Sequence, residues 1–215
     1  MVRIKEFVFN PFMENTYLLY DESGEGVIID PGCYNKKEKD TLRNFVVENS
    51  LKITALINTH CHVDHVLGNN FVKNTFNTRL YIHKLDVTTL KSNEVVAPAY
   101  GFHEFEACEA DFFIDENDTV TFGTQQLEVL FVPGHAPGHI ALFHREQRFC
   151  ISGDVLFQGS VGRTDLPGGD MDTLLNSVHN KIFPLGDDVV LYPGHGPKTD
   201  VGIEKLTNPF CRLRA

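Results

Sequence analysis

The alternation of hydrophobic and polar positions predicts several short strands at the start of the chain. Runs typical of β-strands lie at 3–9, 16–20 and 26–29. They are separated by Asn10-Pro11 and by the turn-forming segment Asp21-Glu22-Ser23-Gly24. This order indicates antiparallel strands.

The pattern then changes to helical spacing. Between 37 and 50, Leu42, Phe45 and Val46 recur at helical intervals with charged residues on the other side, and 53–57 is typical of a buried strand. Further along, the pattern predicts a helix at 66–76 and a strand at 79–82. Residues 93–110 have no persistent period and contain Pro98 and Gly101, which predicts a loop.

The second half of the chain repeats this style. Short β runs lie at 119–122, 127–132, 140–143, 148–151 and 189–192. An amphipathic helix is predicted before the last of them, from the spacing of Met171, Leu174, Leu175, Val178 and Ile182. Two β-rich halves that each carry helices favour an α/β fold of four layers, an αββα sandwich. We expect a single domain over 1–215, although the order of elements leaves other α+β folds open.

Composition and charge narrow the function classes. The chain has 215 residues, 42% of them hydrophobic, and a formal net charge of -10. So acidic a chain, with no long basic run, is a poor nucleic-acid binder. The sequence shows no signal peptide and no apolar run of membrane-spanning length, and its five cysteines are odd in number and not closely paired. We therefore expect a cytoplasmic protein that acts on a small molecule, with no nucleic-acid or membrane partner.

The strongest chemical motif is His60-Cys61-His62-Val63-Asp64-His65, which places four metal-binding side chains within six residues after a predicted core strand. On an extended strand end, residues two apart point the same way, so His60 and His62 can bind one ion. Asp64 and His65 lie past the turn and would face a second position. The alternation turns Cys61 away from the metal, and we expect it to be a buried structural thiol.

Three further candidates share one context. His135, Asp154 and His195 each follow a glycine turn directly after a β run, in Pro133-Gly134-His135, Ser152-Gly153-Asp154 and Pro193-Gly194-His195. Loops at strand ends are where functional sites are commonly built. The repeated context favours a shared role in metal binding.

These motifs resemble the metallo-β-lactamase superfamily. The resemblance rests on the histidine cluster, on the later His, Asp and His, and on Asp30-Pro31-Gly32 in the first half. The sequence is most similar to the short, glyoxalase II-like (hydroxyacylglutathione hydrolase-like) members, through Pro133-Gly134-His135-Ala136-Pro137-Gly138-His139, Gly162-Arg163-Thr164-Asp165, Pro193-Gly194-His195-Gly196-Pro197 and Asn208-Pro209-Phe210. The resemblance implies the αββα fold.

It also implies a dinuclear metal site. One ion would be bound by His60, His62 and His135, the other by Asp64, His65 and His195, and the Asp154 carboxylate would bridge them. The resemblance further implies that Asp64 and Asp154 are catalytic. Well-known lactamases of this superfamily have a cysteine at the position of Asp154, which makes a β-lactam a less favoured substrate here. We expect two zinc ions, and the oxygen bridge also suits iron or manganese.

Two dications that share one water lower its pKa and yield a bridging hydroxide, the nucleophile of a hydrolase at neutral pH. A thiolate leaves with little acid assistance, so thioesters of the S-2-hydroxyacylglutathione type fit this machinery. Full-length glyoxalase II enzymes carry a helical C-terminal region with basic contacts to glutathione. Here, the basic residues after His195 are Lys198, Lys205, Arg212 and Arg214, which leaves glutathione recognition open.

Other polar residues near the motifs are expected to support the site. Asp30 is predicted to accept a hydrogen bond from the ligand loop, and His139 to have a supporting or packing role. Thr59 is explained equally well by orienting a ligand and by β-propensity. Arg163 and Asp165 form either a structural ion pair or a substrate contact. The remaining histidines have no motif context and are expected at the surface or as ordinary polar residues: His83, His103, His144 and His179.

Two alternative functions remain. Persulfide dioxygenases, which use one iron, share His-x-His-x-Asp-His and Gly-Arg-Thr-Asp with this chain. Their last histidine usually lies in Pro-Ala-His-Asp, whereas this chain has Pro193-Gly194-His195-Gly196, which favours the hydrolase. The other possibilities are hydrolysis of another ester, a lactone or a phosphodiester, and a non-catalytic binding role. The acidity of the chain disfavours a nuclease, and the complete ligand set disfavours a pure binding protein.

Overall fold

The computed structural model describes residues 1–212. Of the basic residues considered above, Arg214 lies outside this range. The chain divides into two compact units, one formed by Met1–Ile114 with Thr121–Gln126, the other by Asp115–Val120 with the chain from Leu127 onward. The predicted single domain over 1–215 stays a prediction.

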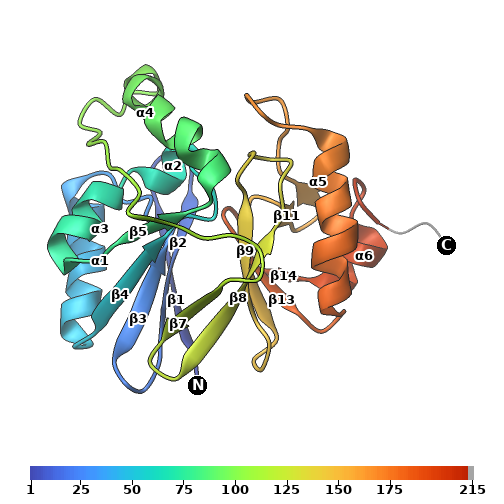
Figure 1. The fold of residues 1–215 in the computed structure, drawn as a ribbon, viewed down its shortest axis with the longest axis horizontal. Coiled ribbons are helices and arrows are strands. Elements are labelled where there is room, and N and C mark those ends of the chain that lie inside the picture. Colours follow the sequence, from blue (N-terminus) through green and yellow to red (C-terminus); the bar gives the residue numbers. More distant parts are fainter. Residues whose placement is uncertain (213–215) are drawn as a thin grey trace. The chain divides into compact units, whose positions relative to one another are not determined.

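The first unit is built on a six-stranded sheet in the order β1-β2-β3-β4-β5-β6 (Figure 1). The strands are β1 (Arg3–Phe9), β2 (Glu14–Tyr20), β3 (Glu25–Ile29), β4 (Lys52–Ile57), β5 (Leu80–Ile82) and β6 (Phe112–Phe113). β1, β2 and β3 pair antiparallel, whereas β3, β4, β5 and β6 pair parallel. The parallel strands β3 and β4 are apolar runs that are largely buried, as expected for strands covered on both faces.

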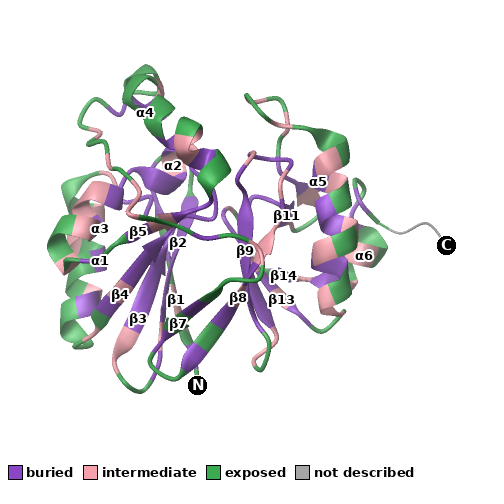
Figure 2. Cartoon of the chain, in the orientation of Figure 1, coloured by how far each residue is buried: buried purple, intermediate pink, exposed green. Residues whose placement is uncertain are grey.

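The helices of the first unit are α1 (Lys36–Glu48), α2 (Val63–Val66), α3 (Asn69–Phe76), the 3₁₀ turn η1 (Lys84–Asp86) and α4 (Val87–Ala99). α1 starts with a capping box between Asn35 and Glu38 and buries Leu42 and Val46. These side chains pack in one apolar core with Val72 of α3 and Leu56 of β4. In Figure 2 the buried faces of α1 and α3 accordingly lie toward the sheet.

One prediction in this unit is wrong in part, and a second is confirmed with a shifted boundary. The segment predicted as a loop at 93–110 begins with the last two turns of α4, where the buried Asn93 interrupts the apolar period and Pro98 lies in the final turn. The helix predicted at 66–76 is confirmed by α3, although α3 begins at Asn69 and Val66 is the last residue of α2. Gly68 separates them, and a side chain there would meet Cys33 Sγ at 2.5 Å.

The second sheet has the order β14-β13-β10-β9-β8-β7. Its strands are β7 (Thr119–Phe122), β8 (Gln125–Phe131), β9 (Ile140–His144), β10 (Phe149–Gly153), β13 (Val190–Pro193) and β14 (Thr199–Asp200), and a separate two-stranded sheet is formed by β11 (Leu156–Phe157) and β12 (Ser160–Val161). The tip of the β7–β8 hairpin belongs to the first unit, where Thr124 donates to Asp21 at 2.9 Å.

The helices of the second unit are α5 (Met171–Ser177), which continues as the π-helical turn η2 (Val178–Ile182) and the 3₁₀ turn η3 (Phe183–Leu185), and α6 (Val201–Thr207). The apolar stripe predicted for 171–182 packs as expected, because Leu174, Val178 and Ile182 are buried in one core with Cys150 and Leu191. Each unit therefore has a sheet, covering helices and an apolar core of its own. Within residues 1–212, no helix has the length and apolar character needed to span a membrane.

Candidate metal centre

The topology of the first unit places Asp30 and the histidine cluster at one edge of its sheet. Asp30 directly follows β3, and the ligand segment, residues 58–65, follows β4. Because β3 and β4 run parallel, their carboxyl ends lie at the same edge. The ligand segment therefore stands on a rigid, buried part of the sheet.

The four predicted ligands of this segment lie together. The ring centroids of His60 and His65 are 4.1 Å apart and those of His60 and His62 are 4.8 Å apart. The Nε2 atom of His65 lies 3.7 Å from Asp64 Oδ2. His60 and His65 are buried, and His62 and Asp64 are partly exposed. Three imidazoles and a carboxylate gathered in this way form a donor set suited to zinc or to iron and manganese.

Asp30 supports this cluster as predicted. Its Oδ1 accepts the backbone N–H of Thr59 at 2.7 Å, and its Oδ2 accepts the Thr59 hydroxyl at 2.5 Å. Oδ2 also lies 3.2 Å from His65 Nδ1. A proton on Nδ1 that faces Asp30 leaves the Nε2 lone pair of His65 available for a metal. Thr59 has the orienting role that the sequence left open, since its hydroxyl lies 3.2 Å from His60 Nδ1.

Two asparagines that the sequence analysis did not identify hold the backbone of the ligand segment. The Asn58 side chain donates to the carbonyl of His65 at 3.1 Å, and Asn69 in turn donates to Asn58 Oδ1 at 2.8 Å. Asn10, on the β1–β2 turn, donates to the carbonyl of Asp64 at 3.0 Å. Of these, Asn58 had a signal in the sequence, because it lies between a predicted buried strand and Thr59.

Cys61 is fully buried and belongs to the apolar core of the first unit, as its alternation predicts. Its backbone N–H donates to Asp86 Oδ2 at 2.6 Å, and its carbonyl accepts from the Asn93 side chain at 2.9 Å. Burial, and then the charge of Asp86, raise the pKa of the Cys61 thiol well above its usual range. A neutral thiol of this kind is a packing residue rather than a ligand.

Glu14 is a further buried carboxyl beside the cluster. Its Oε1 lies 4.0 Å from His65 Nδ1, and its Oε2 accepts the Thr16 hydroxyl at 2.8 Å. Burial raises the pKa of Glu14 well above its usual range although the charge of His65 lowers it, and the charges of Asp30 and Asp64 act in the same direction as burial. A proton on Glu14 avoids a second buried negative charge next to Asp30.

The second unit brings its three predicted ligands to one sheet edge. His135 follows β8, Asp154 follows β10 and His195 follows β13. β10 and β13 are parallel, and β8 points the same way because both β8 and β10 run antiparallel to β9. Asp154 Oδ2 lies 3.6 Å from Nε2 of His135 and 3.6 Å from Nε2 of His195. One carboxylate oxygen thus lies equally far from two imidazole nitrogens.

The groups around these residues fix the ring of His135 and the backbone of Asp154. Nδ1 of His135 donates to the carbonyl of Arg163 at 2.7 Å, so Nε2 carries the lone pair on the side of Asp154. His139 Nε2 accepts the backbone N–H of Asp154 at 2.9 Å, which gives His139 its supporting role. Gly162 allows this close packing, because a Cβ there would lie 1.9 Å from the Asp154 carbonyl oxygen.

Arg163 and Asp165 form the ion pair that was one of the two predicted roles. The Arg163 guanidinium donates to both Asp165 oxygens at 2.7 Å, and both side chains are exposed. The hydrogen bond from Arg163 lowers the pKa of Asp165 to about 2. The ion pair lies beside the Arg163 carbonyl that accepts the hydrogen bond from His135.

Two of the histidines outside the motifs are buried rather than on the surface. His83 Nδ1 accepts the N–H of Leu85 at 3.3 Å, and His144 Nδ1 accepts the N–H of Gln147 at 3.0 Å. Burial lowers the pKa of His144, whose ring stacks on Phe149. The hydrogen bonds of His83 and His144 are thus made within turns. The partly exposed His179 contacts the Cys211 carbonyl at 2.7 Å. His103 is exposed.

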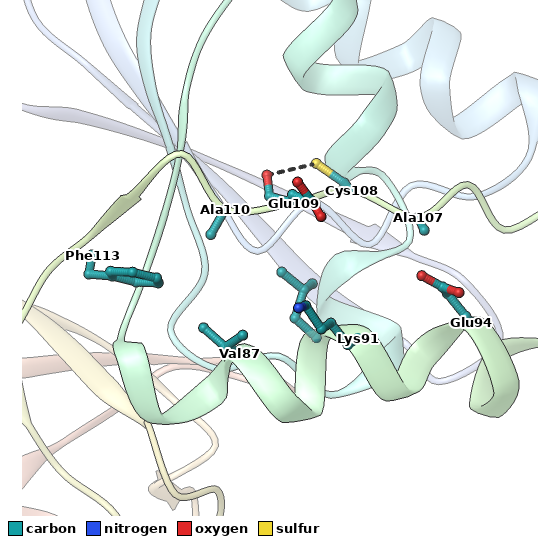
Figure 3. Close-up of a pocket in the computed structure, with 9 residues that line it drawn as sticks. Val87, Lys91, Glu94, Ala107, Cys108, Glu109, Ala110 and Phe113 are labelled. Atoms are coloured by element: carbon teal, nitrogen blue, oxygen red, sulfur yellow. Dashed lines mark hydrogen bonds between the residues drawn. The ribbon is translucent and has the colours of Figure 1, made fainter.

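A pocket of about 630 Å³ in the first unit lies between α4 and the segment 107–113 (Figure 3). Among the described residues, its lining is formed by Val87, Leu90, Lys91, Glu94, Ala107, Cys108, Glu109, Ala110 and Phe113. None of the predicted ligands lines it. Its size suits a small molecule, but its described lining contains no histidine.

Comparison with known proteins agrees with this donor set. A family model described as the metallo-beta-lactamase superfamily matches residues 9–195. The chain is 36% identical over 206 residues to the hydroxyacylglutathione hydrolase GloC of Haemophilus influenzae, and the match covers 95% of each protein. Both the predicted resemblance and its glyoxalase II-like character are thereby confirmed.

Two solved structures are similar over nearly the whole chain. The B3 metallo-beta-lactamase BLEG-1 is 34% identical with a TM-score of 0.86, over 97% of this chain and 99% of that one. TTHA1623, crystallised in a di-iron-bound form, is 34% identical with a TM-score of 0.85, over 96% and 99% of the two chains. These similarities confirm the α/β fold class predicted from the sequence, that of the metallo-β-lactamase fold.

Proposed function

This chain belongs to the metallo-beta-lactamase superfamily, and on that premise we propose that it is a dinuclear metal-dependent hydrolase of thioesters of the S-2-hydroxyacylglutathione type. A metal-dependent hydrolase is supported by the superfamily and by the GloC relative. The thioester substrate is the finer part of the proposal. The observation that carries it is the complete set of seven ligand-type residues in a chain that matches GloC over 95% of its length.

The proposal assigns the ligands as the superfamily resemblance implies. His60, His62 and His135 bind one ion, Asp64, His65 and His195 bind the other, and Asp154 is shared. The internal geometry of each unit supports this division. Asp154 Oδ2 is equidistant, at 3.6 Å, from the Nε2 atoms of two histidines assigned to different ions. The ring centroids of His60 and His62 are 4.8 Å apart, a spacing compatible with a pair on one ion.

The donor chemistry fits such ions. The Nδ1 atoms of His65 and His135 face oxygen acceptors, namely the Asp30 carboxylate and the Arg163 carbonyl. This arrangement directs the lone pair of each Nε2 away from the protein scaffold, and it raises the basicity of the ligand. When bound, two dications would lower the pKa of a shared water and stabilise the negative charge that develops on the substrate carbonyl oxygen.

The chain itself contributes orientation. Asp30 and Thr59 hold the ligand segment from one side, and His139 holds the backbone of Asp154. Asp64 and Asp154, as charged ligands, are the residues proposed to act directly in the reaction. A thioester needs little more, because its thiolate departs without a strong general acid.

Zinc is the proposed metal, and iron or manganese are the alternatives. Histidine and carboxylate donors suit all three. The di-iron form of the similar protein TTHA1623 makes iron a specific alternative that metal analysis has to test.

The proposed partner is a small-molecule substrate, and neither nucleic acid nor a membrane is proposed as one. The net charge of -10 disfavours nucleic acid. Five cysteines, none in a disulfide, fit a reducing compartment, and we propose the cytoplasm.

Hydrolysis of S-D-lactoylglutathione by the purified, metal-analysed protein tests the proposal. We expect turnover that disappears when the metal is removed and returns when it is restored. Turnover no faster than that of the metal-free protein would contradict the thioester assignment. Two further substrates separate the alternatives in the same experiment.

Glutathione persulfide with an oxygen electrode tests the dioxygenase alternative, for which one iron per chain and oxygen uptake are required. A chromogenic cephalosporin tests β-lactam hydrolysis, which the similarity to BLEG-1 makes worth measuring. We expect neither activity to approach that on the thioester, because the superfamily resemblance is strongest to the glyoxalase II-like members.

A further inference from the structure

We propose that Asp86 and Asn93 are positioning residues that hold His60 and His62 in their metal-binding arrangement through the Cys61 peptide groups. The inference rests on the proposed metal site, which His60 and His62 are part of. It is based on the observation that the backbone N–H and the carbonyl of Cys61 are both hydrogen-bonded by side chains of one helical segment, η1–α4.

The two contacts fix two peptide planes. The Cys61 N–H lies in the plane that joins His60 to Cys61, and the Cys61 carbonyl lies in the plane that joins Cys61 to His62. Asp86 Oδ2 accepts the first at 2.6 Å and the Asn93 side chain donates to the second at 2.9 Å. Because the planes are rigid, holding both determines the directions in which the two histidine side chains leave the backbone.

Asp86 stands at the N-cap position of α4 but does not cap that helix. An aspartate at this position normally accepts a backbone N–H from the first turn and so stabilises the helix. Asp86 makes no such bond, and its carboxylate, which is fully buried, is directed to Cys61 instead. The Asp86 side chain therefore binds the ligand segment instead of capping α4.

Asn93 is equally ill-suited to its place in the helix. Asparagine has a low helix propensity, and a polar side chain on the buried face must be hydrogen-bonded to avoid a desolvation cost. Asn93 is only 2% exposed and lies between the buried apolar residues Leu90 and Ala97. An apolar residue would pack better here if packing were the only requirement, and the hydrogen bond to the Cys61 carbonyl explains why it is asparagine.

The neighbouring face of α4 offers matched controls. Lys91 and Glu94 are exposed and line the pocket of Figure 3. The helical spacing of about 3.6 residues per turn places them on another face of α4 than Asn93. Substitutions of these residues change the charge and composition of the same helix. They leave the Cys61 contacts in place.

The experiment compares metal affinity and stability in four variants of the full chain. Asp86→Asn keeps an oxygen acceptor in a side chain of the same shape, Asn93→Leu removes the donor while keeping the branching of the side chain, and Glu94→Gln and Lys91→Met are the controls. The zinc affinity of each is measured by competition with a chromophoric chelator. The thermal unfolding of the metal-free proteins is measured separately, and the cobalt-substituted proteins give a d–d absorption spectrum that reports ligand geometry.

We expect Asn93→Leu to weaken metal binding by about tenfold or more, within the range found for groups that orient metal ligands. Asp86→Asn should show a smaller loss, because its amide oxygen can still accept the Cys61 N–H. Both variants should alter the cobalt spectrum. The controls should stay within about twofold of the wild type and keep its spectrum.

Wild-type metal affinity and an unchanged cobalt spectrum in both Asp86→Asn and Asn93→Leu would overturn the inference. A variant that lowers the melting temperature alone shows a structural role and counts against it. The proposed function fails in a different way, through a wild-type protein that binds its metals but does not hydrolyse thioesters. The metal affinities would remain a valid test in that case.

Discussion

Thr59 donates both its backbone N–H and its hydroxyl to Asp30, at 2.7 and 2.5 Å, across the ends of two parallel strands. The carboxylate that accepts them also faces Nδ1 of His65 at 3.2 Å. One side chain thereby connects the start of the ligand segment to its last histidine. Asp30 has a positive φ of 49°, a conformation that aspartate and asparagine tolerate better than most residues.

Asp30→Ala is expected to lower the free energy of unfolding of the metal-free protein by about 3 kcal/mol, from lost charge-assisted hydrogen bonds and from alanine at a positive φ. Asp30→Asn should cost less, because asparagine suits this backbone and retains an acceptor. Urea unfolding followed by circular dichroism measures both. Asp40→Ala, which removes a surface ion pair with Arg43, is the control and should change the value by less than about 1 kcal/mol. Equal stability of Asp30→Ala and Asp40→Ala would contradict the role of Asp30.

Gly162→Ala is expected to displace the ligands of the second unit, although it replaces none of them. The new Cβ would lie 1.9 Å from the Asp154 carbonyl oxygen and 3.0 Å from His135 Nδ1, so the backbone must shift. We expect metal affinity to fall at least about tenfold, as for other changes beside metal ligands. Isothermal titration of the metal-free protein with zinc measures this.

Gly159→Ala is the matched control for that variant. Gly159 lies three residues earlier and has a positive φ of 67°, and a methyl group added to it would have no neighbour within 4 Å among the described residues. Alanine there is strained, at a cost of about 1 kcal/mol, but it should leave metal affinity unchanged. If both variants bind zinc equally well, the close packing at Gly162 is not what holds His135 and Asp154.

Local and distant parts of the site differ in how far they can be predicted from sequence. The cluster from His60 to His65 is visible because its ligands are neighbours in the chain, and the strands that precede each ligand are visible because buried runs are apolar. Asp86 and Asn93 carry no such mark, since their partner Cys61 is 25 and 32 residues away. Asn10 is still farther from Asp64, whose carbonyl it holds.

The same long-range contacts explain the error in secondary structure. Asn93 puts a polar residue on the buried face of α4, which removes the apolar period by which a helix is predicted. The residue that makes the helix hard to predict is the one that holds the ligand segment. A local pattern reports burial against apolar neighbours, and it fails where a buried contact is a hydrogen bond.

Cys150 should make stability decline in alkaline solution. Burial raises the pKa of its thiol from 9.0 to about 12. Above pH 9 the unfolded chain loses this proton while the folded chain keeps it, so stability that is present below pH 9 is lost as pH rises toward 12. The loss attributable to this group is about 1.4 kcal/mol per pH unit.

The measurement compares urea unfolding of the wild type and Cys150→Ala between about pH 8 and pH 11. The variant has a lower stability at pH 8, because it leaves a cavity in the core of the second unit, but its decline with pH should be shallower. Parallel curves for the two proteins would show that Cys150 does not contribute to the alkaline loss.

Removal of the metal should lower stability as well as abolish hydrolysis. An ion that binds only the folded chain stabilises it by about 2.7 kcal/mol at a free concentration one hundred times its dissociation constant. Thermal unfolding of chelator-treated protein, with and without added zinc, measures the difference.

Asp154→Ala should lose part of the zinc-dependent stabilisation and nearly all hydrolysis, since Asp154 Oδ2 lies equally close to His135 and His195. A variant that retained two ions per chain and full activity would show that Asp154 does not bridge them.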